Sequence, residues 1–160
     1  MQMEEMKNLI ASSDIEKELL KNLNTIFADS DYEILRIRIN ENKKKNIQIM
    51  IDHKRKNIDI NDCAKYSRKI SNYLENNNLI LDEFDLEISS PGLDRPLTRL
   101  KDFLKYRGDM VSITEINADN KKIKHKGKLA QVTQNNIFID QNNDLVSIKF
   151  SKICSAKLLI

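Results

Sequence analysis

Conformationally special residues are concentrated at one point of this chain. The 160 residues include only three glycines and two prolines, and three of these five are Pro91, Gly92 and Pro96. Each proline fixes its own φ and keeps the preceding residue out of the helical region, while the glycine can adopt a positive φ. The segment is therefore predicted to be a stiff, sharply turned connector. We place a domain boundary there, with an N-terminal domain at residues 1–91 and a C-terminal domain at residues 92–160.

The N-terminal domain shows alternating patterns of helix and strand. Ser13 and Glu16 have the spacing of a capping box, and Asp59 or Asn61 can cap a second helix. Apolar residues at helical or alternating spacing then predict the elements between these signals. They are a helix at 14–28, strands at 32–40 and 47–51, a helix from about 60 to 75, and a strand at 84–88. Residues 1–12 show no clear pattern, and we expect them to fray.

The C-terminal domain is predicted to be mostly strand. Thr98 is expected to cap a short helix, with Gly108 as its C′ residue. The remaining residues form short apolar runs separated by polar turns, with strands expected at 110–116, 123–132, 137–140, 145–150 and 153–159. Five short strands in so few residues favour a small closed barrel, which leaves no exposed sheet edge. We therefore predict an α+β fold, with an α/β domain of two helices on a three-stranded sheet followed by an SH3-like (Sm-like) β-barrel.

Charge is unevenly divided along the chain. Residues 1–97 carry 15 Lys and Arg against 18 Asp and Glu, a net charge of −3. Residues 98–160 carry 12 against 6, a net charge of +6. The C-terminal part is therefore expected to prefer anionic partners.

Several function classes are disfavoured by the sequence. No apolar run approaches the roughly 20 residues that span a bilayer, and the charged first ten residues do not resemble a signal peptide, so we expect a cytoplasmic protein with no membrane partner. Cys63 and Cys154 are far apart and are expected to be reduced thiols. His53 and His125 lie in lysine-rich segments, which disfavours a bound metal ion. We expect neither a metal site nor a cofactor.

The connector and its flanks also carry a resemblance to a known family. They have the sequence Glu87-Ile88-Ser89-Ser90-Pro91-Gly92-Leu93-Asp94-Arg95-Pro96-Leu97. This segment resembles the signature of the RimP family of ribosome maturation factors, and the match includes both prolines. Supporting features follow in the family's order at Ile60–Ala64, Phe103, Gly108, Val111, Gly127–Leu129 and Phe150–Leu158. The resemblance covers residues 13–160.

The resemblance implies a fold and a function. Members of the family have an N-terminal α/β domain followed by an SH3-like barrel. Their implied role is to bind the free small (30S) ribosomal subunit or its precursor and to assist incorporation of the twelfth small-subunit ribosomal protein, near the decoding centre, as the ribosomal RNA matures. The expected partners are thus the free small subunit, that ribosomal protein and ribosomal RNA. We expect a monomer that is not an enzyme.

The connector residues admit two interpretations. Ser89, Ser90, Gly92, Asp94 and Arg95 could contact a partner directly, or the segment could only fix the orientation of the two domains. Either serine could also be suggested as a nucleophile, but nothing places a base beside it, and the chain has neither a G-x-S-x-G elbow nor a phosphate-binding loop. We therefore predict no catalytic residue.

Lysines form the second candidate site. Lys124, Lys126 and Lys128 would share one face of a strand, where they could neutralise RNA phosphates or simply form a solvated face. Lys43–Lys45 and Lys54–Lys56 are expected to be solvated loops. The alternative function is that of a general RNA-binding Sm-like protein, which would form a ring through its barrel edges.

Overall fold

The chain forms two compact units. A computed structural model describes residues 9–80 and 82–159. The first unit is Ala11–Pro91, and the second begins at Gly92 and also includes Leu9 and Ile10. Leu9 is 2% exposed within the second unit's core, and Ala11 is fully buried. The expectation of fraying was therefore wrong for residues 9–12, while residues 1–8 lie outside the described part of the chain.

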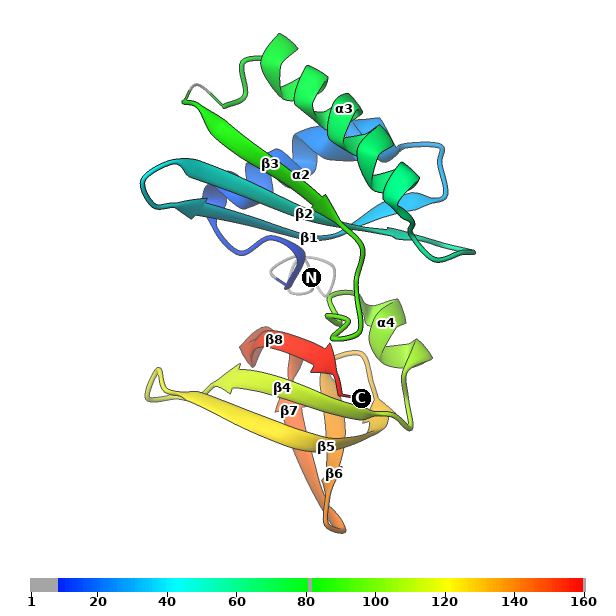
Figure 1. Ribbon diagram of the computed structural model, residues 1–160. Coiled ribbons are helices and arrows are strands. Elements are labelled where there is room, and N and C mark those ends of the chain that lie inside the picture. Colours follow the sequence, from blue (N-terminus) through cyan, green and yellow to red (C-terminus); the bar gives the residue numbers. More distant parts are fainter. Residues whose placement is uncertain (1–8, 81, 160) are drawn as a thin grey trace. The chain divides into compact units, whose positions relative to one another are not determined.

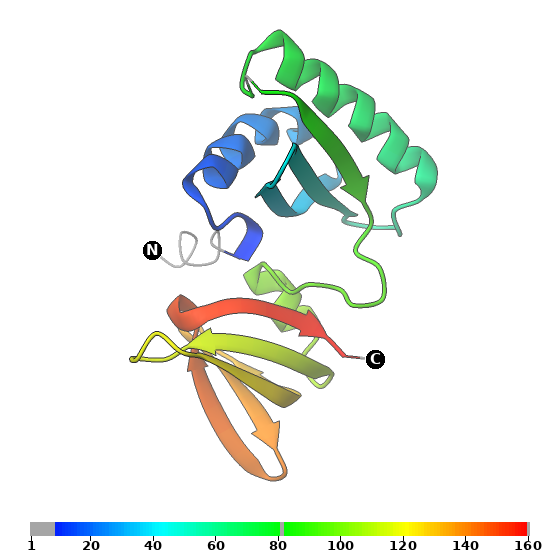
Figure 2. The same ribbon diagram turned by 60° about the vertical axis from the view of Figure 1, so that its left-hand side comes forward.

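The first unit is a three-stranded sheet with two helices on one face (Figures 1 and 2). Its elements are α2 (Asp14–Phe27), β1 (Tyr32–Glu41), β2 (Lys45–His53), α3 (Ile60–Asn76) and β3 (Phe84–Ser89). The strand order is β1-β2-β3, with β1 and β2 antiparallel and β2 and β3 parallel, so α3 is the crossover between the parallel pair. The predicted two helices and three strands are confirmed.

The apolar faces of these elements meet in one core. In the β1–β2 hairpin Ile37 lies opposite Ile49 and Ile39 opposite Ile47, so the buried side chains share a face. A register shift between Ile34 and Arg36 turns two successive residues of β1 inward. The rings of Phe27 from α2 and Tyr66 from α3 stack at 4.6 Å, which fixes both helices on the same side of the sheet.

A buried carboxylate joins the start of α2 to the sheet. Ser13 and Glu16 form the predicted capping box, and Glu16 is only 4% exposed. Its Oε1 accepts from the backbone amides of Ser12 and Ser13 at 3.0 and 3.1 Å, and its Oε2 accepts from the Ile39 amide of β1 at 2.8 Å. Burial by itself raises the pKa of Glu16, but these hydrogen bonds to the carboxylate outweigh burial, so the pKa lies below its ordinary value.

The second unit is a five-stranded antiparallel sheet with a short helix. Its elements are α4 (Leu100–Lys105), β4 (Met110–Ile116), β5 (Lys122–Val132), β6 (Asn136–Gln141), β7 (Asp144–Lys149), a 3₁₀ turn (Phe150–Lys152) and β8 (Ile153–Leu158). All five predicted strands are confirmed, in the order β7-β6-β5-β4-β8. Among the described residues no pairing joins β7 to β8, so the hydrogen bonding does not itself establish the expected closed barrel. Inward side chains from all five strands nevertheless share one core with Phe103 of α4.

The ends of α4 differ from the sequence prediction. The N-cap is Arg99 and not Thr98, because the carboxylate of Asp102 accepts from both of their backbone amides, at 3.2 and 3.0 Å. The C-cap is Tyr106, so Gly108 lies two residues beyond it and not at C′. Gly108 does have a positive φ, +95°, and its amide donates to the Leu129 carbonyl at 2.7 Å. The glycine therefore ends the turn that leads from the helix into β4.

Replacing Glu16 with Gln tests the buried carboxylate. Removing the charge while keeping the shape should lower the free energy of unfolding by about 1–3 kcal/mol at neutral pH, because hydrogen bonds to a charged acceptor are lost. A depressed folded-state pKa stabilises the fold above the ordinary carboxyl value of 4.5 and loses that effect as pH falls. The variant should therefore show a flatter fall in stability in acid, measured by urea unfolding at several pH values.

Glu18→Gln is the matched control, since Glu18 is exposed on the same helix. Equal losses of stability for the two variants would contradict the assigned role of Glu16.

Candidate functional site

The second half of the connector belongs to the second unit. The Leu97 amide donates to the Ala156 carbonyl and the Leu158 amide donates to the Arg95 carbonyl, both at 2.9 Å. Pro96 lies opposite Lys157 as an antiparallel bridge, and the Leu97 side chain is fully buried in the core. Residues 95–97 thus act as a short added strand that covers part of the free edge of β8.

A buried carboxylate fixes the arginines of this segment. Asp102 is 2% exposed, and its two oxygens accept from Nε and Nη2 of Arg99 at 2.9 and 2.7 Å. Nη2 of Arg95 lies 3.6 Å from Oδ1 of the same carboxylate, and the guanidinium of Arg95 stands over the ring of Tyr106 at 5.7 Å. The Arg95 side chain is only 15% exposed. These contacts indicate a structural part for Arg95 in the second unit, and its direct contact with a partner stays a prediction.

The tip of the connector is open to solvent. Gly92 has φ of +69°, and a Cβ added there would meet nothing within 4 Å, so the glycine is required by backbone conformation and not by crowding. Leu93 is 80% exposed, and Asp94 is also exposed. Of the connector residues nominated from sequence, Ser89, Gly92 and Asp94 are exposed, whereas Ser90 and Arg95 are partly buried. The exposed Leu93 was not nominated.

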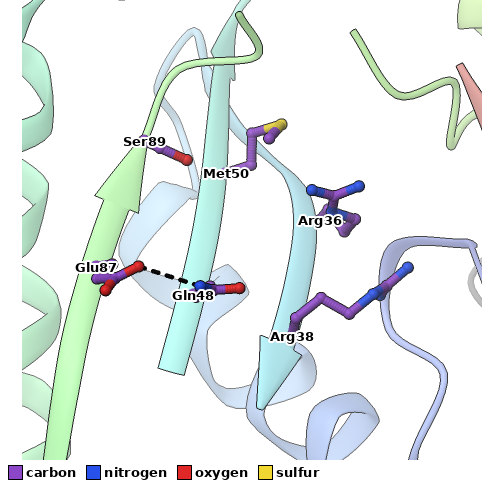
Figure 3. Close-up of a pocket in the computed structure, with 6 residues that line it drawn as sticks. All are labelled: Arg36, Arg38, Gln48, Met50, Glu87 and Ser89. Carbon is purple, nitrogen blue, oxygen red and sulfur yellow. Dashed lines mark hydrogen bonds between the residues drawn. The ribbon is translucent and has the colours of Figure 1, made fainter. Parts of the chain in front are cut away.

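Ser89 ends β3 on the face of the first unit's sheet that the helices leave open. A shallow polar cavity on this face is lined by Arg36, Arg38, Gln48, Met50, Glu87 and Ser89 (Figure 3). Gln48 Nε2 donates to Glu87 Oε2 at 3.1 Å, as the dashed line shows. Burial lowers the pKa of both arginines, and for Arg38 the charge of Arg36 lowers it further. None of the described residues that line this cavity is a histidine, and Glu87 contributes the carboxylate.

The three predicted lysines of β5 share one exposed face. Lys124, Lys126 and Lys128 are exposed, whereas Gly127 and Leu129, which alternate with them, are buried. A Cβ on Gly127 would lie 2.5 Å from the carbonyl oxygen of Asp140 on β6, so this position cannot hold a side chain without moving β6. The glycine therefore allows the close approach of β5 and β6 beneath the lysine row.

Sequence reasoning missed a fourth cation on this face. Ser112 of β4 pairs with Lys126 of β5 on one side and with Lys157 of β8 on the other. Residues at paired positions point to the same face of a sheet, so Lys157 joins the row. We name the side chains of Lys124, Lys126, Lys128 and Lys157 the β5 lysine face. Lys157 joins the row only through the register between β4 and β8, and this register cannot be read from a single sequence.

Redox or metal chemistry would have to come from the two cysteines or from a cluster of metal-ligating side chains. Cys63 and Cys154 are free thiols, and burial followed by the nearby carboxylates of Asp62 and Asp59 raises the pKa of Cys63, which makes it a poor nucleophile. Within residues 9–80 and 82–159, no group of three or more His, Cys, Asp or Glu could hold a metal ion. No helix in the same ranges is long and apolar enough to cross a bilayer.

These features define a two-unit α+β protein in which a proline-bounded connector leads into a small antiparallel sheet with a basic face. Residues 22–94 match the family model described as the RimP N-terminal domain. The match extends from within α2 to the exposed tip of the connector, and it includes the Ser89-Ser90-Pro91-Gly92 part of the signature. Residues 22–94 therefore carry a domain of the RimP type, and the family to which this domain model belongs is one of ribosome maturation factors.

Replacing Asp102 with Asn tests the buried ion pairs. The change leaves two largely buried guanidinium groups without their carboxylate, so the free energy of unfolding of the second unit should fall by about 3–5 kcal/mol. Asp94→Asn removes an exposed carboxylate nearby and should change stability by less than about 0.5 kcal/mol. Both are measured by urea unfolding followed by circular dichroism. A loss below about 1 kcal/mol for the Asp102 variant would contradict the assignment.

Proposed function

We propose that this chain is a non-enzymatic assembly factor for the small (30S) ribosomal subunit. It binds the free subunit or its precursor in the cytoplasm and assists incorporation of the twelfth small-subunit ribosomal protein. The single observation that carries the proposal is the RimP N-terminal domain match over residues 22–94, continuous with the connector signature through Leu97. The family match supports a role in ribosome maturation in general, and the particular ribosomal partners are the further part of this proposal.

The second unit supplies the binding surface in this proposal. Its sheet is an SH3-like barrel whose β5 lysine face contacts ribosomal RNA phosphates, where each neutralised phosphate releases counterions. The exposed connector tip, with Leu93 and Asp94, meets the ribosomal protein. Gly92 sets the backbone turn that presents this tip.

The mechanism requires no covalent chemistry. A factor that binds one conformation of the immature RNA more tightly than another shifts the population by the difference in affinity. Ser89 and Ser90 have no catalytic part in it.

The rival function is that of an Sm-like RNA-binding protein that assembles into rings. Ring assembly uses free strand edges on both sides of each subunit. Residues 95–97 cover part of the β8 edge, which favours a monomer. Light scattering separates the two functions, because a stable ring would support the rival and contradict the monomeric assembly factor.

Co-sedimentation tests the proposed function. The full chain should sediment with purified free small subunits and not with assembled ribosomes, because a factor that assists assembly is expected to leave once the small subunit is complete. Sucrose-gradient fractions analysed by immunoblot give the measurement. Equal association with both particles, or with neither, would count against the proposal.

The β5 lysine face has its own test. Changing Lys124, Lys126 and Lys128 together to Ala should weaken binding to free subunits and reduce the slope of log affinity against log salt by about 2–3, at roughly 0.9 per phosphate contact. Changing Lys105, Lys149 and Lys152 to Ala removes the same charge from elsewhere in the unit and serves as the control. A salt slope unchanged in the first variant would show that the row is only a solvated face.

A further inference from the structure

The first unit carries a second concentration of positive charge that the β5 lysine face does not include. Residues 53–72 contain six Lys and Arg and two Asp, whereas the remainder of Ala11–Pro91 contains seven Lys and Arg and thirteen Asp and Glu. A unit with a net negative charge thus concentrates positive charge in one helix and the loop before it.

The helix presents its cations on one face. Lys65, Arg68 and Lys69 are spaced i, i+3 and i+4 and are all exposed, while the neighbouring Tyr66 and Ile70 are buried. The distance along the helix axis from Lys65 to Lys69 is about 6 Å. The three charges therefore form a compact row instead of a ring around the helix.

The loop before α3 adds a cation at a fixed place. Lys56 Nζ lies 2.6 Å from Oδ2 of Asp62, while the Tyr32 hydroxyl donates to Oδ1 of the same carboxylate at 2.5 Å. Asp62 also accepts from the Asp59 amide as part of the capping box of α3. The hydrogen bonds from Lys56 and Tyr32 hold the pKa of Asp62 well below its usual range, so the carboxylate stays charged. Lys56 is accordingly held beside the helix.

Aromatic rings bring the loop and helix cations together. Lys56 and Lys65 lie over the same Tyr32 ring, at 5.6 and 5.5 Å from its centroid, and Lys69 lies 5.4 Å from the centroid of Tyr66. The two tyrosine rings are themselves in contact, with centroids 4.8 Å apart. Cation–π attraction thus holds several ammonium groups close together against their mutual repulsion. The array is formed before any ligand arrives.

We propose that this surface binds the phosphate backbone of structured RNA. It consists of Lys54, Arg55, Lys56, Lys65, Arg68 and Lys69, and we name it the α3 basic face. The choice of RNA as the polyanion rests on the proposed function, and the surface is separate from the β5 lysine face. Because Tyr66 is 2% exposed beneath its lysines, it offers no platform for stacking, so recognition is through phosphate and shape and not through bases.

Other classes of partner fit this surface less well. A helix that lies on a membrane inserts its apolar face, but the apolar face of α3 is buried on its own sheet. Protein interfaces are depleted in lysine at their centres and enriched in accessible aromatic side chains, whereas here the lysines cover the tyrosines. Contact between phosphate groups and ammonium groups that are already in position is consistent with the buried apolar face of α3 and with the lysine-covered tyrosines.

The test uses the full chain and a fluorescein-labelled RNA duplex of about 20 base pairs, long enough to present two successive minor grooves. The variant changes Lys65, Arg68 and Lys69 together to Gln. The control changes Lys43, Lys44 and Lys45 to Gln, which removes the same charge from the same unit. Lys43, Lys44 and Lys45 lie in and beside the turn between β1 and β2, outside the α3 basic face. Fluorescence anisotropy is measured over a range of salt concentrations, and circular dichroism confirms that each variant is folded.

The α3 variant should bind the duplex at least about tenfold more weakly than wild type, with a salt slope lower by about 2–3, and the control should stay within about twofold of wild type. Duplex binding by the α3 variant within about twofold of wild type, or an equal loss in both variants, would overturn the inference. So would a variant that loses binding to phosphatidylserine-containing vesicles while keeping duplex binding, because the surface would then serve a membrane. Failure of wild type to sediment with free subunits would refute the proposed function, whereas the anisotropy result alone decides the α3 basic face.

Discussion

The buried carboxylate of Asp102 fixes how the chain enters its second unit. It accepts hydrogen bonds from the amides at the start of α4, forms a two-point ion pair with Arg99, and lies beside the guanidinium of Arg95. Without that negative charge two guanidinium groups would stand close together with low exposure, which is costly in a poorly solvated site. The position of the 95–97 segment on the edge of β8, and of Leu97 in the core, depends on this arrangement.

This arrangement divides the connector between two roles. The tail, from Arg95 to Leu97, is hydrogen-bonded to β8 and buried, so changes there act through the stability of the second unit. The tip, with Gly92, Leu93 and Asp94, is exposed, so changes at Leu93 and Asp94 should affect the stability of the second unit little. In the proposed function the exposed tip contacts a partner, while the tail anchors the connector to the second unit. In the proposed function the tip and the β5 lysine face belong to the same unit.

Local signals were sufficient to predict the elements of this fold. The Ser13 capping box, the alternation of isoleucines in β1 and β2, and the polar turns of the second unit each involve neighbours in sequence, and each gave an element close to its observed bounds. One error involves distant residues, because Leu9 is buried in a core formed largely by residues beyond position 96. The other is local: α4 begins after Arg99 because the Asp102 side chain, three residues further on, accepts from the Arg99 amide.

Long-range pairing also limited what the sequence could predict of the candidate sites. The alternation of Lys124, Lys126 and Lys128 was visible in sequence, but Lys157 joins them only through the β4–β8 register. The cations of α3 were overlooked because they lie within a helix and do not form a continuous basic run, and only the fold places Lys56 over the same tyrosine ring as Lys65. Closure of the barrel also depends on long-range pairing, which alternation within single strands does not specify.

Amide hydrogen exchange followed by NMR tests most directly whether residues 95–97 are part of the second unit. The amides of Leu97 and Leu158 donate to the Ala156 and Arg95 carbonyls, so both should exchange as slowly as amides within the β4–β5 pair. The amide of Leu93, in the exposed tip, should exchange much faster. If the amides of Leu97 and Leu158 exchanged as fast as that of Leu93, the connector would not be bonded to β8, and the account built on Asp102 would be wrong.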